Sequence, residues 1–242
     1  SLEYHCVDFK IGLYILCKSS LLSPEPHRIV PCKKLGSQKA ILFSYIVYTF
    51  RYFLACLRAI FAVINELSSS TDKPIVAITG SNGKSTVTTM LGVMGNESGI
   101  KTAIGGNLGT PALDLLNESV EMYVIELSSF QLERVTVLNA KVATVLNISE
   151  DHLDRHDGIK GYAKEKQKIF SGDGVMILNE DDSIVKAMND EAREVTFFTV
   201  QKNEGFYLQE RQGESWLMND DQPIMRQQEL PLEGLHNTAN AL

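Results

Sequence analysis

The stretch Thr79-Gly80-Ser81-Asn82-Gly83-Lys84-Ser85-Thr86 decides how this chain is interpreted. It follows an apolar run at residues 75–78 and precedes a helix-like stretch at residues 87–97. A strand that turns through glycines into a helix directs several backbone N–H groups at one point, where the positive end of the helix dipole also lies. The stretch therefore predicts a phosphate-binding loop between a strand and a helix.

The residue types inside this loop suit a nucleotide and its metal ion. Gly80 and Gly83 can adopt positive φ and let the backbone approach a ligand closely. Lys84 supplies an ammonium for the outer phosphates, and the Ser85 hydroxyl is placed to bind Mg²⁺. The strict P-loop pattern requires a further glycine where this chain has Ile78, so the loop is a shortened variant. The alternative is a glycine-rich turn that binds no ligand.

The composition divides the chain in two. The whole chain carries 23 Lys and Arg against 30 Asp and Glu, and this acidic balance argues against nucleic acid as a partner. Residues 1–72 nevertheless hold eight Lys or Arg and five Asp or Glu, whereas the remainder hold fifteen and twenty-five. All four cysteines lie in the first part without C-x-x-C spacing, which favours isolated reduced thiols.

Residues 40–64 are apolar enough to raise the question of a membrane span. Arg51 and Arg58 interrupt the run, so that no uncharged stretch of about 18 residues remains. We therefore favour a buried or interfacial helix over a transmembrane helix, and expect no stable membrane insertion.

From residue 73 onward, apolar strands alternate with helical segments. Strands are expected at residues 75–78, 102–104, 122–127, 142–148, 175–179 and 195–200, and helices at 87–97, 159–170 and 183–189. Ser128 and Ser129 can cap a further helix that begins near Phe130. This alternation predicts an α/β fold, with a mainly parallel sheet and flanking helices. Short segments on either side of Gly213 predict an antiparallel edge.

Polar residues follow four successive strands of the predicted sheet. The phosphate loop follows the first strand, Asn107 follows the second, Glu126 ends the third, and residues 147–152 follow the fourth. In open α/β sheets, ligands collect at the carboxyl ends of the strands, so this pattern predicts a nucleotide site. A buried carboxylate is costly without a cation, which favours metal binding by Glu126 over a structural salt bridge.

The segment Ser149-Glu150-Asp151-His152-Leu153-Asp154-Arg155-His156 is rich in candidate ligands. On its own it could be a solvated helix cap. Beside the other motifs, His152 is a candidate contact to metal or phosphate, whereas His156 is expected at the surface.

Five motifs together resemble those of the Mur ligases: TGSNGKST at residues 79–86, GGNLG at 105–109, ELSSFQLE at 126–133, NISEDHLDR at 147–155 and HNTANAL at 236–242. The ELSSFQLE string is most similar to the members that add D-glutamate. It differs from relatives that add other amino acids and from folylpolyglutamate synthases. The resemblance covers residues 73–242 and corresponds to the central ATPase domain of the family.

The resemblance implies a cytoplasmic, monomeric enzyme of peptidoglycan synthesis that uses ATP and Mg²⁺. In this family the carboxylate of UDP-N-acetylmuramoyl-L-alanine attacks the γ-phosphate of ATP and forms an acyl phosphate. The amine of D-glutamate then displaces phosphate and forms the amide. Phosphoryl transfer of this kind depends on positioning and charge neutralisation.

The resemblance also implies roles for residues that match its motifs. Lys84 would stabilise the outer phosphates of ATP, and Ser85 with Glu126 would hold one Mg²⁺. Asn107 and Ser129 would contact the muramoyl-alanine substrate.

The family uses a carbamylated lysine as a metal ligand, and His152 would join a second metal ion. The register from Tyr162 selects Lys166 as that lysine. A neutral amine that captures CO₂ becomes a carbamate, which resembles a carboxylate as a ligand for Mg²⁺. Lys164 and Lys168 lie two residues away and would point elsewhere on a helix. The alternative is a solvated lysine-rich helix face.

Asn237 and Asn240 match asparagines that contact the adenine side of ATP in the family. Leu235 departs from the glutamine that is usual at its position in the family. Without the resemblance, an asparagine pair near a helix end would be interpreted as a helix cap.

The family motifs stop short at both ends. Residues 1–60 lack the G-x-G turn expected of the first domain of the family. We interpret residues 1–72 as an atypical segment of unclear fold that arises from a misread frame, a fusion or strong divergence, and favour the misread frame. Residues 73–242 would be a central ATP-binding domain truncated inside a helix that begins near His236. We therefore expect the chain alone not to complete ligation.

Two alternative functions remain open at this point. One is another amide ligase of the Mur or folylpolyglutamate type with a different substrate. The other is a nucleotide-binding remnant without ligase activity.

Overall fold

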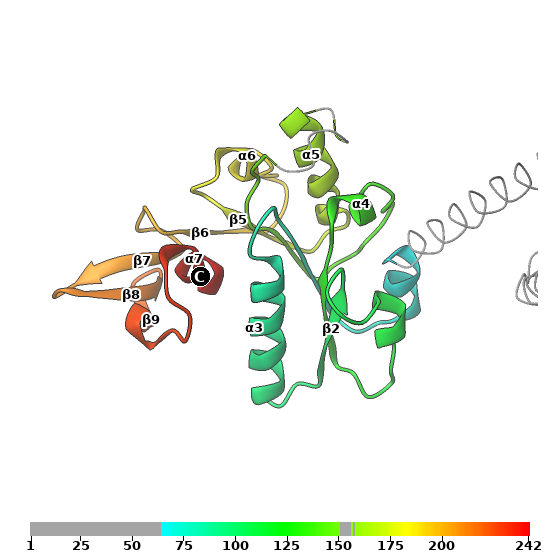
Figure 1. Ribbon diagram of the computed structural model, residues 1–242, viewed down its shortest axis with the longest axis horizontal. Coiled ribbons are helices and arrows are strands. Elements are labelled where there is room, and N and C mark those ends of the chain that lie inside the picture. The colour runs from blue at the N-terminus through cyan, green and yellow to red at the C-terminus, as the bar shows by residue number, and fades with distance from the viewer. Residues whose placement is uncertain (1–63, 151–155, 157) are drawn as a thin grey trace, which may run out of the picture. The chain divides into compact units, whose positions relative to one another are not determined.

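A mixed sheet of nine strands organises the described part of the protein, for which the computed structural model covers residues 64–150, 156 and 158–242 (Figure 1). The apolar run at residues 40–63, and with it the question of a membrane helix there, lies outside the described residues. Every helix in the described ranges is too short or too polar to cross a bilayer.

The parallel part of the sheet contains the six predicted strands. They are β1 (Ile75–Thr79), β2 (Thr102–Gly106), β3 (Met122–Glu126), β4 (Val142–Val145), β5 (Val175–Asn179) and β6 (Val195–Thr199). In space the order is β2-β3-β1-β4-β5-β6. Helices cover both faces of these strands, which explains why the strands are nearly continuous apolar runs. The predicted α/β class and the mainly parallel sheet are confirmed.

The strand β4 ends at Val145, before the predicted end at residue 148. The backbone at Asn147 and Ile148 forms hydrogen bonds with residues outside the sheet. The Asn147 carbonyl accepts a hydrogen bond from the Ser81 N–H at 2.9 Å, and the Ile148 N–H donates to the Asp182 carboxylate at 2.7 Å. The apolar pattern continues through residue 148 because Ile148 is buried, not because the strand continues.

Helices of the described chain lie on both faces of the sheet. They are α3 (Lys84–Glu97), α4 (Ser129–Leu132), α5 (Gly158–Gln167), α6 (Ser183–Lys186) and α7 (Leu235–Ala241), with 3₁₀ turns η1 (Ala112–Leu115), η2 (Lys168–Phe170) and η3 (Gln227–Glu229). The helix α3 covers one face over a cluster that includes Ile78, Val87 and Val124. On the other face, Leu132 and Tyr162 bring α4 and α5 into the larger core cluster.

A further helical turn at residues 64–70 packs into the larger core cluster. Its side chains Ile64 and Leu67 are fully buried there beside Ile75 of β1. These two residues lie on the N-terminal side of residue 73, where the composition of the chain changes.

Local signals in the sequence explain several helix ends. Ser128 caps α4: its hydroxyl accepts from the Gln131 N–H, and the Gln131 side chain accepts from the Ser128 N–H at 2.9 Å. This reciprocal pair is a capping box, as the serine pair predicted. After α3, Gly99 takes φ 82° in the position that commonly ends a helix. The single helix expected at residues 159–170 is α5 followed by the 3₁₀ turn η2.

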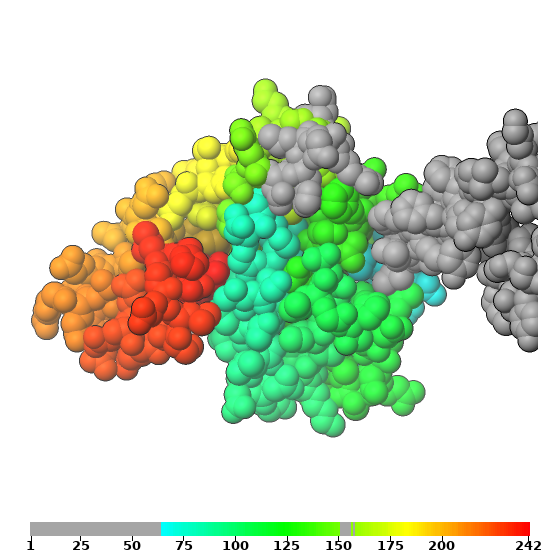
Figure 2. Space-filling view, viewed as in Figure 1, coloured from blue at the N-terminus to red at the C-terminus, as the bar shows by residue number. Residues whose placement is uncertain are grey.

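The antiparallel edge predicted from the C-terminal pattern is also present. It consists of β7 (Phe206–Arg211), β8 (Glu214–Asn219) and β9 (Gln222–Arg226), and β7 pairs in parallel with β6. Gln212 and Gly213 form the two-residue turn with φ 54° and 82°, the left-handed values that a tight hairpin requires. The chain then returns through α7, which packs beside α3 (Figure 2).

Candidate nucleotide and metal site

The predicted phosphate loop connects β1 to α3 at the carboxyl edge of the sheet. Gly80 and Gly83 have positive φ, 158° and 82°. A Cβ atom on Gly83 would lie 2.5 Å from Oδ1 of Asn240, so α7 packs directly against the loop at this glycine. Because α3 begins at Lys84, the N–H groups of its first turn that have no intrahelical partner open into the loop.

The segment after β4 holds the loop in place. The Ser81 N–H donates to the Asn147 carbonyl at 2.9 Å, and the Asn82 N–H donates to Oδ1 of Asn147 at 2.8 Å. Nδ2 of Asn147 returns a hydrogen bond to the Asn82 carbonyl at 3.1 Å. The Ser149 N–H donates to the Ser81 hydroxyl at 2.9 Å. The loop conformation therefore depends on a neighbouring strand as well as on its own glycines.

The Lys84 side chain curls over the loop that precedes it. Its Nζ donates to the carbonyl of Gly80 at 2.9 Å and to the carbonyl of Ser81 at 3.0 Å. An ammonium at the mouth of the loop is suited to contact phosphate oxygens there.

Three of the predicted site residues meet at the Glu126 carboxylate. Glu126 is only 2% exposed at the end of β3. Its Oε2 accepts from the Ser85 hydroxyl at 2.8 Å, and its Oε1 accepts from Nδ2 of Asn107 at 2.8 Å. Two neutral donors offset part of the desolvation of this carboxylate, and an adjacent cation would offset more.

The Ser85 hydroxyl and the Glu126 carboxylate fit a hard divalent cation. Both present oxygen ligands, which Mg²⁺ prefers, and Mg²⁺ commonly retains several waters beside one or two carboxylates. Among the described residues, no three His, Cys, Asp or Glu side chains converge on one point. The candidate His152 lies outside the described residues.

Lys166 lies behind the phosphate loop and is 1% exposed. Its Nζ donates to the Gly80 carbonyl at 2.9 Å and to the Thr79 hydroxyl at 3.2 Å, and lies 4.6 Å from the centre of the Tyr162 ring. The carbonyl of Gly80 therefore accepts from both Lys84 and Lys166.

The neighbouring lysines of α5 and η2 point elsewhere. Lys164 is exposed, and Lys168 pairs with Glu165 at 2.5 Å and donates to the Glu133 carbonyl at 2.7 Å. A solvated lysine face accounts for Lys164, but it cannot account for Lys166.

The structure corrects the expectation for His156, which is half-buried and not at the surface. Its ring stacks on Phe130, with centroids 5.9 Å apart, and lies 5.3 Å from the ring of Tyr162. Its Nε2 is 3.2 Å from the hydroxyl of Ser129, which is 3% exposed. Sequence reasoning missed this position because Ser129, the partner of His156 in the preceding helix α4, lies 27 residues away in the chain.

Asn237 and Asn240 line a pocket of about 290 Å³ beside the phosphate loop. Neither asparagine caps α7: Nδ2 of Asn237 donates to the Glu233 carbonyl at 2.7 Å, and Asn240 faces the loop at Gly83. The pocket is also lined by Asn82, Gly83, Thr86, Leu146, Asn147, Asn179, Phe198, His236 and Ala239.

Sequence reasoning did not single out Asn179 or Phe198 as pocket residues. Asn179 is a polar residue at the end of an apolar strand, the same signal that identified Glu126. The rule about strand ends could therefore have found it. Phe198 had no such signal, because its position in the wall follows from the pairing of β6 with β5.

A larger pocket of about 670 Å³ lies at the opposite, amino-terminal edge of the strands. It is lined by Ser69, Ser70, Thr71, Asp72, Lys73, Leu116, Asn117, Glu118 and Tyr123. None of the candidate site residues belongs to it, so size alone does not locate the nucleotide site.

Comparison with known proteins agrees with this geometry. Residues 78–242 match the family model described as the Mur ligase middle domain. The chain is 45% identical over 189 residues to the UDP-N-acetylmuramoylalanine–D-glutamate ligase of Methylococcus capsulatus, covering 77% of this chain and 41% of that protein. It is 50% identical over 171 residues to the Pseudomonas fluorescens protein of the same name, covering 70% and 38%. The chain thus spans about two fifths of the length of these relatives.

Solved structures show the same fold. A MurF structure from Acinetobacter baumannii matches with a TM-score of 0.61 at 23% identity, covering 76% of this chain and 44% of that one. The MurF ligase of Thermotoga maritima, solved in complex with ADP, matches with a TM-score of 0.56 at 17% identity, covering 76% and 47%. Together with the family match across residues 78–242, the sheet and its phosphate loop establish that the chain belongs to the Mur ligase family, as its middle domain.

Proposed function

We propose that this chain is the ATP-binding part of a ligase that joins UDP-N-acetylmuramoyl-L-alanine to D-glutamate in peptidoglycan synthesis. The observation that carries the proposal is the Glu126 carboxylate, bonded to Ser85 of the phosphate loop and to Asn107 after β2. One buried group thereby links the nucleotide side of the site to the predicted substrate side. Support for D-glutamate as the amino acid comes from the relatives that are 45–50% identical and carry that name.

In the proposed reaction, the substrate carboxylate attacks the γ-phosphate of ATP and releases ADP, and the amine of D-glutamate then displaces phosphate from the acyl phosphate. Lys84 orients and neutralises the outer phosphates, and the N–H groups of the loop hold them in place. Ser85 and Glu126 would hold Mg²⁺, which would neutralise charge on the phosphate oxygens. Asn107 and Ser129 orient the muramoyl-alanine end of the substrate, so that its carboxylate meets the phosphate in line.

The remaining predicted residues complete the site in this proposal. Asn237 and Asn240 contact the adenine side of ATP from the 290 Å³ pocket. His152 would contribute a ligand to a second metal ion. Lys166 reacts with CO₂ through its neutral amine and loses a proton to solvent, which leaves a carbamate as a further oxygen ligand. We place this enzyme in the cytoplasm as a monomer.

Binding of Mg²⁺-ADP to the chain itself tests the nucleotide part of this proposal. We expect calorimetry to detect binding that Lys84→Met abolishes, because the outer phosphates lose their cation. Lys101→Met removes the same charge from an exposed position before β2 and should leave the affinity unchanged. Equal affinities of the two variants would contradict the proposed role of Lys84.

A chimera tests whether this segment supports the proposed ligation. Residues 73–242 would replace the matching segment of the Methylococcus capsulatus ligase, and phosphate release would be measured with ATP and UDP-N-acetylmuramoyl-L-alanine. We expect release with D-glutamate and not with other amino acids. Release with a different amino acid would favour another ligase of the Mur or folylpolyglutamate type.

A nucleotide-binding unit without ligase activity is the second candidate function, because the phosphate loop and the adjoining 290 Å³ pocket account for nucleotide binding by themselves. It predicts that Mg²⁺-ADP binds to the chain while the chimera releases no phosphate with any amino acid.

A further inference from the structure

Four consecutive polar residues, Asn179-Glu180-Asp181-Asp182, form the turn between β5 and α6. We call this segment the 179–182 turn. Its side chains bond to the ends of β4, β6 and α6, so four elements are connected by one short segment at the carboxyl edge of the sheet. The function proposed above assigns no role to Glu180, Asp181 or Asp182, and Asn179 enters it only as a residue in the wall of the 290 Å³ pocket.

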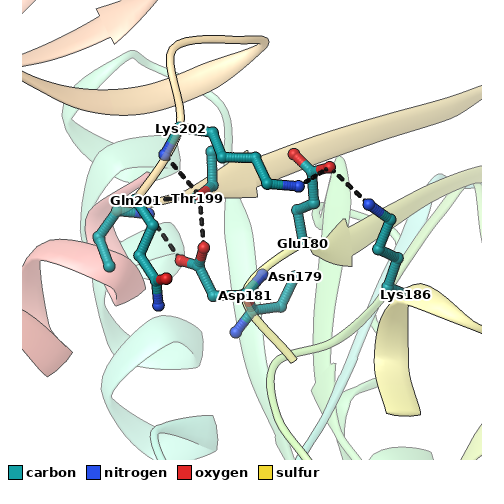
Figure 3. Close-up of polar contacts among 8 residues, drawn as sticks. Asn179, Glu180, Asp181, Lys186, Thr199, Gln201 and Lys202 are labelled. Atoms are coloured by element: carbon teal, nitrogen blue, oxygen red, sulfur yellow. Dashed lines mark hydrogen bonds and ion pairs between the residues drawn. The ribbon is translucent and has the colours of Figure 1, made fainter. Parts of the chain in front are cut away.

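Glu180 and Asp181 connect the turn to the end of β6. The Asp181 carboxylate accepts from the Thr199 hydroxyl at 2.5 Å and from the Val200 N–H at 2.7 Å. Glu180 lies between Lys186 and Lys202, with Oε1 at 2.8 and 2.5 Å from their Nζ atoms (Figure 3). These contacts fix the turn itself.

Asn179 and Asp182 face the other way, towards the segment after β4. Nδ2 of Asn179 donates to the Leu146 carbonyl at 2.9 Å, and its Oδ1 accepts from the Asp181 N–H at 2.9 Å. Oδ2 of Asp182 accepts from the Ile148 N–H at 2.7 Å. Ile148 is 7% exposed, so its N–H has little access to water if this acceptor is removed.

The other carboxylate oxygen of Asp182 binds the first turn of α6. Oδ1 accepts from the N–H groups of Ile184 and Val185, at 2.9 and 3.1 Å, and thereby caps α6. One carboxylate thus joins the start of α6 to the backbone after β4. Hydrogen bonds to an ionised acceptor are stronger than those between neutral groups, so we expect the Asp182 carboxylate to bind both segments strongly.

Residues 146–149 therefore lie between the 179–182 turn and the phosphate loop. On the loop side, the Leu146 N–H donates to the Thr79 carbonyl at 2.9 Å, and Asn147 and Ser149 hold Ser81 through the contacts described above. Asn179 and Asp182 contact the same segment from the other side. A shift of this segment must move the loop, because the same backbone serves both neighbours.

We propose that Asn179 and Asp182 are positioning residues of the nucleotide site: they hold residues 146–149 and, through this segment, the phosphate loop. Asn179 also stands in the wall of the 290 Å³ pocket together with Leu146 and Asn147, so one residue sets the place of the loop and the shape of the pocket. The expected effect on nucleotide affinity rests on the proposed function, in which this loop holds nucleotide phosphates. The expected effect on the conformation of the loop is independent of that function.

The substitution Asp182→Asn tests this role without removing the helix cap. The amide oxygen can still accept from Ile184 and Val185, whereas the amide nitrogen would face the Ile148 N–H, donor against donor. Glu180→Gln is the matched control, because it removes the same charge from the same turn and touches none of residues 146–149. Both variants are made in the full chain.

Amide hydrogen exchange, followed residue by residue, reports on the loop without any ligand. We expect Asp182→Asn to accelerate exchange at Ser81, Asn82 and Ser149 by about tenfold, and Glu180→Gln to leave these amides unchanged. The amides of β7 and β8 report on global stability, so any change in their rates should be smaller than the change at the loop amides of Asp182→Asn. Unchanged loop amides in Asp182→Asn, or an equal acceleration in β7 and β8, would overturn the proposal, because the second result is global destabilisation.

Binding of Mg²⁺-ADP then connects the loop to function. We expect the Kd to rise about tenfold in Asp182→Asn and to stay unchanged in Glu180→Gln, with adenosine, which lacks phosphates, less affected than ADP. If the unmodified chain does not bind Mg²⁺-ADP, the proposed function fails while the exchange data still decide whether Asp182 positions the loop.

A second variant covers the case in which Asp182→Asn does not fold. Asn179→Ala removes the hydrogen bond to the Leu146 carbonyl and leaves both carboxylate contacts of Asp182 in place. We expect faster exchange at Ser81 and weaker Mg²⁺-ADP binding in this variant as well. A loop as protected as that of the unmodified chain, with the same Kd, would count against the proposal.

Discussion

Individual buried polar groups at the carboxyl edge of the sheet are each held by specific donors or acceptors. Glu126 receives hydrogen bonds from Ser85 and Asn107, and Lys166 donates to Thr79 and Gly80. Desolvating such groups is costly unless they are hydrogen-bonded, so these contacts hold each of the two buried side chains in one position. A single substitution at this edge should therefore change geometry as well as charge.

Gly83 offers a direct test of local geometry, with Gly99 as its matched control. Both glycines have φ 82°, but a Cβ on Gly83 meets Asn240 at 2.5 Å, whereas a Cβ on Gly99 meets no atom within 4 Å. We expect Gly99→Ala to cost about 1–2 kcal/mol of unfolding free energy from backbone strain alone. Gly83→Ala should cost about 1 kcal/mol more, because Asn240 must move. Urea unfolding measures both values.

The Asn240→Ala background separates strain from contact. There Gly83→Ala should cost no more than Gly99→Ala, since the contact atom is gone. A persistent difference would mean that Asn240 is not what makes glycine necessary at this position.

Lys166 is the residue on which the proposed carbamate depends. In the chimera described above we expect Lys166→Ala to abolish ATP-dependent turnover, and short carboxylic acids to restore part of it by supplying the missing oxygen ligand. Lys164→Ala, which removes an exposed lysine from the same helix, should retain full turnover. A ¹³C signal from labelled bicarbonate on the unmodified chain, absent in Lys166→Ala, measures the carbamate directly. Full activity of Lys166→Ala would remove this lysine from the site.

At the scale of elements, the connections between strand ends determine the site. The strand β4 stops at Val145, because the backbone beyond it serves the phosphate loop on one side and Asp182 on the other. The short helix α4 begins with a capping box, which places Ser129 in its first turn, beside His156. The phosphate loop and Ser129 are thus each positioned where two elements meet.

The ion pairs of Glu180 in the 179–182 turn should make the stability of the folded chain sensitive to acid. The hydrogen bond from Lys186, and next that from Lys202, hold the pKa of Glu180 below its usual value of 4.5. A carboxyl with a lowered pKa in the folded state adds stability that is fully present above its unfolded-state pKa and lost as the pH falls through the folded-state pKa. We expect the unmodified chain to lose this contribution below about pH 4.5.

Urea unfolding at pH 7 and at pH 3 measures that contribution. Glu180→Gln should be less stable than the unmodified chain at pH 7, and the gap should narrow at pH 3, where the carboxyl becomes protonated. The difference should also shrink at high salt, since both lysines are about half exposed. A gap of the same size at both pH values would contradict the assignment.

At the scale of the described molecule, the sheet order brings distant segments to one edge. The order β2-β3-β1-β4 puts the loop after β1 between Glu126 of β3 and the segment after β4. The phosphate loop, Asn107, Ser129 and the 290 Å³ pocket come from segments between residues 79 and 240. A ligand that spans the phosphate loop and this pocket would therefore contact several parts of the sheet at once.

Nucleotide binding should stabilise this whole unit. At a free Mg²⁺-ADP concentration of 100 times the Kd, linkage predicts about 2.7 kcal/mol of additional unfolding free energy. Thermal unfolding with and without Mg²⁺-ADP measures the effect, and EDTA should remove the part that depends on the metal. The same shift in Lys84→Met would show that the stabilisation does not come from the phosphate loop.

The sequence alone predicted the phosphate loop, the succession of strands and main helices from residue 75 onward, and membership in the Mur ligase family, which the comparison confirms. Contiguous stretches of sequence carry the signals for these features: a strand followed by a glycine-rich loop and a helix, and apolar residues at periodic positions. Only the tertiary structure decided that Ser85 and Asn107 bind the two oxygens of Glu126, and that His156 is half-buried against Ser129. The same holds for the turn at Asp182 that holds the loop from behind. Such contacts join segments tens of residues apart, and they depend on which strands become neighbours and which face each side chain takes, for which a single stretch of sequence carries no signal.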